Sequence, residues 1–471
     1  MHYLDAHDDR KFDPATHQRK DSLFDPIDGK PPAPSLSSED QTSKSKFISW
    51  DQCPDTDKWR LTTKINDSNL QTSYFTKKWI DSQAERWRAD ADDFDCSSSA
   101  VAGTKQIGET KRILWSNWTE SVVRDPITSP ILFNYDNLVV QSDDVKVMEY
   151  KRLLKMLYQY GIVLITGTPT YTQSLPVDAM SESVKRSHGT NAAGGTSETA
   201  ESAILHLASI IGYHPLQTLY GAGVWSTSCL SSFYSLGCAT TSASTADSAY
   251  GTTSLPLHTD MTYIHNPPGA QVFLMVQPAV AQASSSNDDD SIIPNGQSLY
   301  VDGFAAAKQL FLENPDAFRL LATTPRRYRC IDEVEGWHLE ATGPLIETIP
   351  SGKNEWGPVK SIRHNDLDRL PDLPPYPSAT ASTATNDDIN NDSFYHRMRE
   401  AHEAWDDILR RDSMRLVMNL QPGDCVLVAN QRCLHGRYAF ETTESPRVVM
   451  GCYVGMDELS SKWRKAGFRV L

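Results

Sequence analysis

Three residues that could bind a metal lie in two short segments far apart along the chain. His258 and Asp260 are separated by one residue within the β-prone run 255–260, and His435 follows the apolar run Cys425–Ala429. In a strand, residues i and i+2 face the same side of the sheet, so the imidazole of His258 and the carboxylate of Asp260 are predicted to converge. Two histidines and one carboxylate on one face of a metal are typical of non-haem Fe(II) oxygenases, because this set leaves positions for an oxo acid and dioxygen.

A His-x-Asp pair by itself is a weak signal, because it occurs by chance and a single histidine is more often a hydrogen-bonded core or surface residue. Arg447 strengthens the prediction. It lies beyond the polar segment 442–446 and begins an apolar run. We expect an antiparallel return that brings its guanidinium group back beside the metal face, where a planar fork suits the distal carboxylate of 2-oxoglutarate.

The segments that must position these residues alternate between short β-prone runs and helices. Strands are predicted at 162–166, 270–276, 298–301, 426–428 and 448–454, and helices at 145–160, 305–314 and 394–411. Many short strands with a few outer helices favour a barrel or sandwich over a parallel α/β sheet. We therefore expect a mostly β fold with peripheral helices.

The chain has 471 residues, more than the roughly 250–300 residues beyond which single cores stop growing. We predict a small N-terminal β domain over 1–120 and a catalytic domain over 121–471. Strand-like alternation at 59–65 and 70–80, around the turn-forming residues 66–69, supports the small domain. Polar segments predict connectors at 31–48 and 87–112 and exposed insertions at 226–245, 281–295 and 378–392.

Composition excludes several classes of function. The net charge of −15 without a long basic run argues against a nucleic acid partner and suits a cationic small molecule. The 8 cysteines form no C-x-x-C pair, so we expect reduced thiols.

No run approaches the ~18–20 apolar residues of a membrane span, and the start lacks the features of a signal or transit peptide. We expect a soluble intracellular protein, with the cytoplasm favoured, and a homodimer remains open.

Several segments resemble one known family. Residues 255–273, 298–321, 361–369 and 434–454 are similar to the γ-butyrobetaine hydroxylase and trimethyl-lysine dioxygenase family of TauD-like enzymes, in the same order. The resemblance runs from about residue 145 to the C-terminus, and is nearer to the trimethyl-lysine branch. It implies a double-stranded β-helix (jelly-roll) core, with His258, Asp260 and His435 as Fe(II) ligands and Arg447 as the anchor of the cosubstrate 2-oxoglutarate.

The resemblance also implies how a substrate cation is bound. A quaternary ammonium group donates no hydrogen bond, so proteins bind it with the faces of aromatic rings. Tyr220, Trp225, Tyr250 and Tyr453 match the positions of the family's aromatic cage. Each of them could instead be an ordinary core aromatic. Asp247 is a candidate partner for a cationic amine, with a solvated loop carboxylate as the alternative.

The chain departs from the family at several positions. Trp225 lies one residue farther from Tyr220 than the family pattern has it, and residues 429–432 read Ala-Asn-Gln-Arg where an Asp-Asn-Trp-Arg type of sequence is usual. The N-terminal segments resemble a small zinc-binding domain, but residues 6–11 contain no cysteine and Leu70 stands where a histidine ligand is expected. Without thiolates we expect no structural zinc. Either this domain has eroded or the sequence lacks its true start, which leaves a mitochondrial location open.

These features predict an Fe(II)- and 2-oxoglutarate-dependent hydroxylase whose activity ascorbate supports. The expected substrate is trimethyl-lysine in carnitine biosynthesis, with γ-butyrobetaine second, and dioxygen is the oxidant. Two alternatives remain. One is a family member recruited to a different small molecule, such as a secondary metabolite. The other is a catalytically silent binding protein on the same fold.

Overall fold

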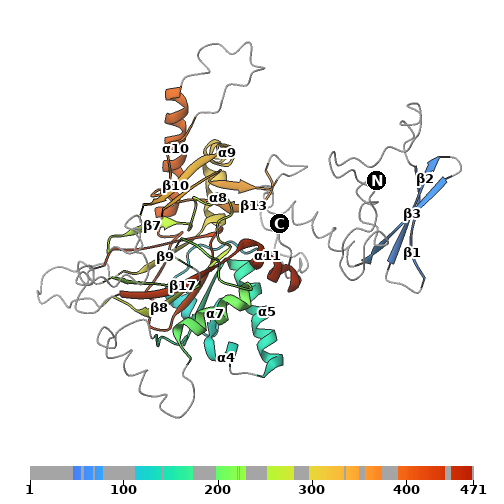
Figure 1. The fold of residues 1–471 in the computed structure, drawn as a ribbon. Coiled ribbons are helices and arrows are strands. Elements are labelled where there is room, and N and C mark those ends of the chain that lie inside the picture. Colours follow the sequence, from blue (N-terminus) through green and yellow to red (C-terminus); the bar gives the residue numbers. More distant parts are fainter. Residues whose placement is uncertain are drawn as a thin grey trace, which may run out of the picture. The chain divides into compact units, whose positions relative to one another are not determined.

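The computed structural model describes residues 46–54, 58–66, 69–77, 112–139, 142–172, 198–219, 221, 223–229, 252–279, 296–333, 336–349, 356–373, 391–440 and 447–468. The chain divides into two compact units, Met1–Gly103 and Thr104–Leu471 (Figure 1). None of the described helices is long and apolar enough to cross a membrane.

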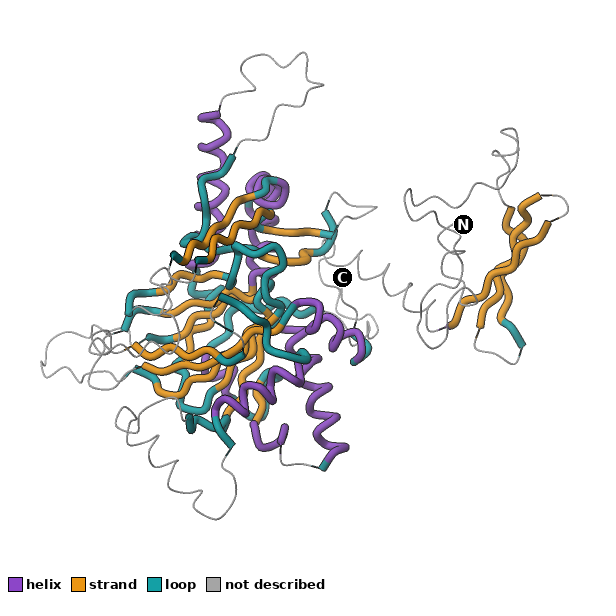
Figure 2. The backbone as a smooth tube through the Cα atoms, in the orientation of Figure 1, coloured by secondary structure: helices purple, strands orange, loops and turns teal. Residues whose placement is uncertain are grey.

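The first unit contains a three-stranded antiparallel sheet of β1 (Lys46–Gln52), β2 (Lys58–Asn66) and β3 (Asn69–Thr76), drawn in orange in Figure 2. Leu61 and Phe75 on β2 and β3 are buried. The strands predicted around residues 66–69 are confirmed as far as Thr76. The prediction of a connector over 31–48 is wrong for residues 46–48, which begin β1. These residues form a strand because they pair with β2.

The second unit has mixed α/β structure and contains a six-stranded sheet. Neighbouring strands of this sheet are antiparallel, except for the two strands at one edge, Leu132–Asn134 and Ile162–Thr166, which are parallel. In spatial order the strands are β4 (Leu132–Asn134), β5 (Ile162–Thr166), β15 (Cys425–Ala429), β8 (Ala270–Gln277), β17 (Arg447–Val454) and β6 (Trp225–Cys229).

A four-stranded sheet packs against one face of this larger sheet. Its order is β14 (Leu416–Met418), β9 (Ser298–Asp302), β16 (Cys433–Arg437) and β7 (Leu255–His258). One core cluster contains side chains from both sheets, among them Leu164 and Val428 of the larger sheet and Tyr300 and Leu416 of the smaller. The two sheets therefore form facing layers with shared apolar packing.

The opposite face of the six-stranded sheet is covered by helices. Val163 and Leu427 alternate along their strands with residues of the inter-sheet core, and they pack with α4 (Tyr135–Val139), α5 (Asp143–Tyr160), α7 (Ala200–Ile211) and α11 (Met456–Lys465). Figure 1 shows α5 and α7 beside this sheet. Alternate side chains of a strand point to opposite faces, so strands buried on both faces are mostly apolar, as in IVLIT of β5.

The turn from α5 into β5 shows how local sequence sets this architecture. Gly161 ends α5 with φ +75°, and its backbone N–H donates to the Leu157 carbonyl. A Cβ at Gly161 would lie 2.8 Å from Cδ of Arg432, so only glycine fits. The predicted helix 145–160 and strand 162–166 are confirmed.

The remaining described elements surround the smaller sheet: α3 (Glu120–Arg124), α8 (Gly303–Glu313), α9 (Pro315–Thr323), β10 (Arg326–Asp332), β11 (Trp337–Gly343), β12 (Ile346–Thr348), β13 (Val359–Ile362) and α10 (Asn391–Arg410). The predicted helices 305–314 and 394–411 are confirmed. The insertion prediction is wrong for residues 226–229, which form part of β6, and for residues 391–392, which begin α10. The insertion 281–295 and the rest of the other two lie outside the described residues.

Candidate metal and substrate site

The structure brings His258, Asp260 and His435 together. His258 ends β7 and pairs in register with His435 on the neighbouring β16. Nε2 of His258 lies 3.3 Å from Oδ1 of Asp260, and Nε2 of His435 lies 3.2 Å from Oδ2. One ligand atom from each residue lies within 4.8 Å of the other two. Two imidazole nitrogens and a carboxylate oxygen make a donor set that suits Fe(II).

Asp260 reaches this position through a turn and not along a strand. Since β7 ends at His258, the predicted convergence of i and i+2 side chains within one strand is wrong as an explanation. The Asp260 backbone N–H donates to Oδ1 of Asn430 at 2.7 Å, and the Asn430 amide donates to the Asp260 carbonyl at 3.1 Å. Asn430 is fully buried, so it holds the turn and thereby orients the carboxylate.

Hydrogen bonds around the triad set the protonation of its members. Nδ1 of His258 lies 2.8 Å from the Pro256 carbonyl, which can only accept, so Nδ1 donates and Nε2 is left to face Asp260. Burial by itself raises the pKa of Asp260, but His435 and His258 outweigh burial and lower that pKa. The side-chain amide of Gln271 donates to Asp260 Oδ2 at 2.8 Å. The carboxylate is thus ionised, and Oδ2, the oxygen that faces His435, is also held by Gln271.

A second group of potential ligands, His364, Asp366 and His402, does not fit a metal. A guanidinium nitrogen of Arg326 lies 3.0 Å from Nδ1 of His402. Because guanidinium only donates, Nδ1 accepts, and the neutral ring carries its proton on Nε2. Nε2 then donates to Asp366 at 3.1 Å. No lone pair of His402 remains for a metal, so this group is a hydrogen-bonded support between α10 and the segment 363–369.

The metal-ligand triad lies on the wall of a cavity of about 160 Å³. Arg437 and Arg447 also line it, and their guanidinium carbons lie 4.9 and 5.5 Å from the ring centroid of Phe440. Burial raises the pKa of Tyr300, another lining residue, against the opposing charge of Arg447. A buried guanidinium group beside a protonated phenol suits a carboxylate.

Arg447 reaches the cavity by a different route from the one predicted. The expected antiparallel return from the segment of His435 is wrong, because β16 belongs to the four-stranded sheet and β17 to the six-stranded sheet. The chain crosses between the two layers, and Arg447 approaches from the layer opposite His435. The cavity is therefore walled by both sheets.

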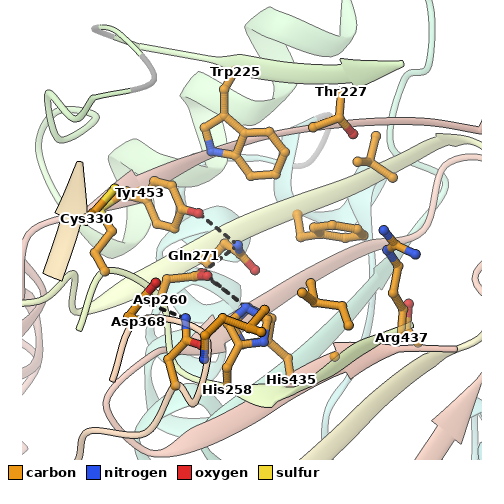
Figure 3. A pocket seen from close by; sticks show the side chains of 18 of the residues that line it. Trp225, Thr227, His258, Asp260, Gln271, Cys330, Asp368, His435, Arg437 and Tyr453 are labelled. Carbon is orange, nitrogen blue, oxygen red and sulfur yellow. Dashed lines mark hydrogen bonds and ion pairs between the residues drawn. The ribbon is translucent and has the colours of Figure 1, made fainter. Parts of the chain in front are cut away.

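Two of the predicted cage aromatics lie on the cavity wall. The rings of Trp225 and Tyr453 have centroids 5.9 Å apart and an interplanar angle of 34°. Figure 3 shows both side chains above the metal-ligand triad. Tyr220, Asp247 and Tyr250 lie outside the described residues.

Sequence reasoning did not single out several lining residues. Gln271, Asn365 and Asp368 face the cavity, and all three lie within the segments 255–273 and 361–369 on which the family resemblance rests. Those segments were recognised as motifs, but the side chains of Gln271, Asn365 and Asp368 gave no separate indication of a chemical role. The orientation of each polar side chain toward the cavity depends on tertiary packing.

The chain is similar in sequence to one family model and to several known enzymes. A family model described as "Taurine catabolism dioxygenase TauD, TfdA family" matches residues 134–453. A mitochondrial trimethyllysine dioxygenase of Gallus gallus is 32% identical over 232 residues, which are 49% of this chain and 47% of that protein. A gamma-butyrobetaine dioxygenase of Pseudomonas sp. (strain AK-1) is 31% identical over 219 residues, 46% of this chain and 48% of that protein.

The chain spans about half the length of the curated relatives that it matches. Among solved structures, asparagine oxygenase is similar with a TM-score of 0.42 and 13% identity over 66% of this chain and 80% of that one. The family model spans well over half of the chain and contains all three candidate metal ligands, which confirms the resemblance found from the sequence: the chain belongs to the taurine catabolism dioxygenase TauD, TfdA family.

Proposed function

We propose that the chain is an Fe(II)- and 2-oxoglutarate-dependent dioxygenase that hydroxylates a C–H bond of a trimethylammonium amino acid. Trimethyl-lysine, in carnitine biosynthesis, is the first candidate and γ-butyrobetaine the second. The observation that carries the proposal is one cavity that joins the metal-ligand triad, Arg447 and the faces of Trp225 and Tyr453. The two facing sheets are consistent with a double-stranded β-helix as the scaffold.

Each part of the cavity has a distinct task in this proposal. His258, Asp260 and His435 would hold iron, which together with 2-oxoglutarate and dioxygen supplies the oxidation of an unactivated C–H bond. Arg447 pairs with the far carboxylate of 2-oxoglutarate and so orients the cosubstrate. The apolar lining, which includes Phe273 and Val449, excludes water from the reacting atoms.

The aromatic wall supports a quaternary ammonium substrate. Such a cation cannot donate a hydrogen bond, but it is attracted to the negative face of an aromatic ring, with a contribution of roughly 0.5–2 kcal/mol per contact depending on desolvation. Trp225 and Tyr453 present two such rings within one wall. The printed names of the relatives, trimethyllysine and gamma-butyrobetaine dioxygenases, point to the same substrate class.

The direct test is succinate formation from 2-oxoglutarate with Fe(II) and ascorbate, measured with and without candidate substrates. Trimethyl-lysine is compared with an isostere that carries a tert-butyl group in place of trimethylammonium. We expect trimethyl-lysine to stimulate turnover far more than the neutral isostere. Equal stimulation by both compounds would contradict recognition of the charge and point to a family member recruited to another substrate. Absence of turnover in an iron-binding protein would favour the silent binding protein.

A variant localises the effect to the aromatic wall. Replacing Trp225 with Leu keeps an apolar side chain but removes the ring, so KM for the cationic substrate should rise by about tenfold, within the energy of one to two cation–π contacts. KM for 2-oxoglutarate should stay unchanged. Trp337→Leu, at an exposed tryptophan of β11, is the matched control and should behave as the unmodified protein.

A further inference from the structure

Met261, the residue directly after the candidate metal ligand Asp260, has a strained backbone. Among the described residues other than glycine, only Asn117 and Met261 have a positive φ, of 57° and 55°. Asparagine tolerates this left-handed conformation, whereas methionine adopts it rarely because Cβ comes too close to the following carbonyl oxygen. Asn117 is exposed, but Met261 is only 3% exposed and lines the cavity. Strain of this kind concentrates at functional sites, where the surrounding structure maintains it.

We propose that Met261 is a positioning residue for Asp260, because its left-handed backbone turns the Asp260 carboxylate toward the imidazoles of His258 and His435. Met261 itself supplies no ligand atom and acts through the direction of the chain. This inference rests on the proposed function, since the iron site is what the turn would position.

The turn that contains Met261 is anchored on both sides of this residue. On one side, the backbone N–H and carbonyl of Asp260 bond to the buried side-chain amide of Asn430 at 2.7 and 3.1 Å. On the other side, the Thr262 carbonyl accepts from the Arg363 guanidinium group at 2.5 Å. A right-handed or extended residue 261 would direct the chain elsewhere, so that both sets of bonds could not form together. The left-handed conformation is therefore required by contacts with distant segments.

The chain before Asp260 is fixed as well. The Thr259 backbone N–H donates to the His364 carbonyl at 2.7 Å, and the Thr259 hydroxyl accepts from the His364 backbone N–H at 3.1 Å. Asp260 thus lies between two fixed neighbours, and its carboxylate lies beside both imidazoles (Figure 3). A ligand whose backbone is held in this way needs little ordering when a metal binds.

The side chain of Met261 explains why glycine does not occupy this position. Glycine adopts a positive φ without strain, but it would leave a gap in the wall of the cavity. The Met261 side chain belongs to the core cluster that contains Trp225 and Tyr453. A side chain branched at Cβ would be more strained in the left-handed region than unbranched methionine. The backbone role and the packing role can therefore be separated by substitution.

The test compares Met261→Gly with Met261→Ala. Both variants remove the thioether chain, and they differ from each other only by Cβ, so glycine alone relieves the left-handed strain. Met261→Ile keeps an apolar side chain but adds the branch at Cβ. Met275→Ile is the matched control, because Met275 is buried in the same core cluster but lies on the strand β8, where a β-branched residue is favoured. Anaerobic titration measures Fe(II) affinity, and thermal unfolding of the metal-free protein measures stability.

We expect Met261→Gly to bind Fe(II) about threefold or more tightly than Met261→Ala, because alanine is destabilising at a positive φ. For the same reason Met261→Gly should unfold about 1–3 °C higher than Met261→Ala. Met261→Ile should weaken Fe(II) binding by about 10- to 100-fold, the usual effect of losing a group that orients a metal ligand. Met275→Ile should bind Fe(II) as the unmodified protein does.

Equal Fe(II) affinities of Met261→Gly and Met261→Ala, or tighter binding by Met261→Ala, would overturn the positioning role. Unchanged affinity in a folded Met261→Ile would also overturn it, and if Met261→Ile does not fold, the comparison of glycine with alanine decides. Failure of the unmodified protein to bind Fe(II) would overturn the proposed function together with this role. One equivalent of bound iron without the advantage of glycine over alanine would overturn this role alone.

Discussion

Gln271 connects the metal-facing carboxylate to the aromatic wall. Its side-chain amide donates to Oδ2 of Asp260 at 2.8 Å and to the hydroxyl of Tyr453 at 3.3 Å. The residue is buried on β8, in the sheet opposite the one that carries both histidines. One side chain therefore orients a candidate metal ligand and a candidate cage residue together.

We predict that Gln271→Leu weakens Fe(II) binding by about 10- to 100-fold, the usual cost of losing a partner that orients a metal ligand. The reason is that the Asp260 carboxylate loses its fixed donor and can rotate. Anaerobic iron titration measures the effect. Gln309→Leu, at a half-buried position on α8 that does not line the cavity, is the control, and equal affinities of the two variants would remove Gln271 from this role.

The two groups of histidines and aspartates should respond differently to substitution. His435→Ala removes one of three protein ligands, so Fe(II) binding and turnover should be lost while the fold is largely kept. His402→Gln alters the group that we exclude as a metal site and should retain one equivalent of iron. Iron stoichiometry under anaerobic conditions distinguishes them. Unchanged stoichiometry in His435→Ala would contradict the triad.

At the scale of elements, one buried ion pair joins the two sheets to the helices around them. Asp302 at the end of β9 is fully buried, accepts from the Phe304 N–H at the start of α8, and pairs with Arg432 at 2.9 Å. Arg432 also donates to the carbonyls of Tyr158 and Gln159 at the end of α5. This pair holds the segment that leads into His435.

We predict that Asp302→Asn lowers the free energy of unfolding by about 3–5 kcal/mol, because it leaves the buried guanidinium group of Arg432 without its counter-charge. Urea unfolding of the purified variant measures the change. Asp316→Asn disrupts an exposed ion pair with Arg319 and should change the free energy by no more than about 0.5 kcal/mol. Equal losses in both variants would contradict the structural role of this pair.

The loop between β13 and α10 makes the free energy of unfolding depend on pH. Burial lowers the pKa of His364 from 6.5 to about 3. Between these two pKa values the unfolded chain binds a proton that the folded chain does not, so stability falls as pH falls below about 6.5. The loss from this residue amounts to about 1.4 kcal/mol per pH unit until the pH approaches the folded value.

His364→Gln should therefore flatten the decline of unfolding free energy between pH 6.5 and pH 5, a window above the folded pKa of about 3. Urea unfolding at both pH values, compared between the variant and the unmodified protein, isolates the contribution of this residue. His338→Gln, at an exposed histidine of β11, should leave the decline unchanged. A slope unaffected by His364→Gln would show that the buried imidazole does not titrate as inferred.

At the scale of the whole molecule, we predict that the purified protein contains no structural zinc, because residues 6–11 lack the cysteines that a tetrahedral site requires. These residues lie outside the described part of the chain, so the prediction rests on ligand chemistry alone. Elemental analysis after the iron site is stripped is the measurement. About one equivalent of tightly retained zinc would contradict it.

The sequence alone determined the elements whose signals are local. Strands buried on both faces are continuous apolar runs, and α5 ends at a glycine that adopts φ +75°, so their positions follow from periodicity and conformational preference. The candidate metal ligands were also predicted from the sequence, because few residue types bind iron and His258, Asp260 and His435 lie within recognisable motifs. β10 and β11 were missed, since a strand with the sequence RRYRCID has no clear apolar alternation.

The tertiary structure alone decided which side chains meet. Arg447 approaches from the sheet opposite His435, and Asp260 is turned toward the imidazoles by Asn430, which is 170 residues away along the chain. Asp368 faces the cavity because Thr262 and Asn365 hold its carboxylate. Each of these arrangements depends on contacts between segments far apart in sequence, and no local preference of the chain encodes the direction of a polar side chain that is fixed by a distant partner.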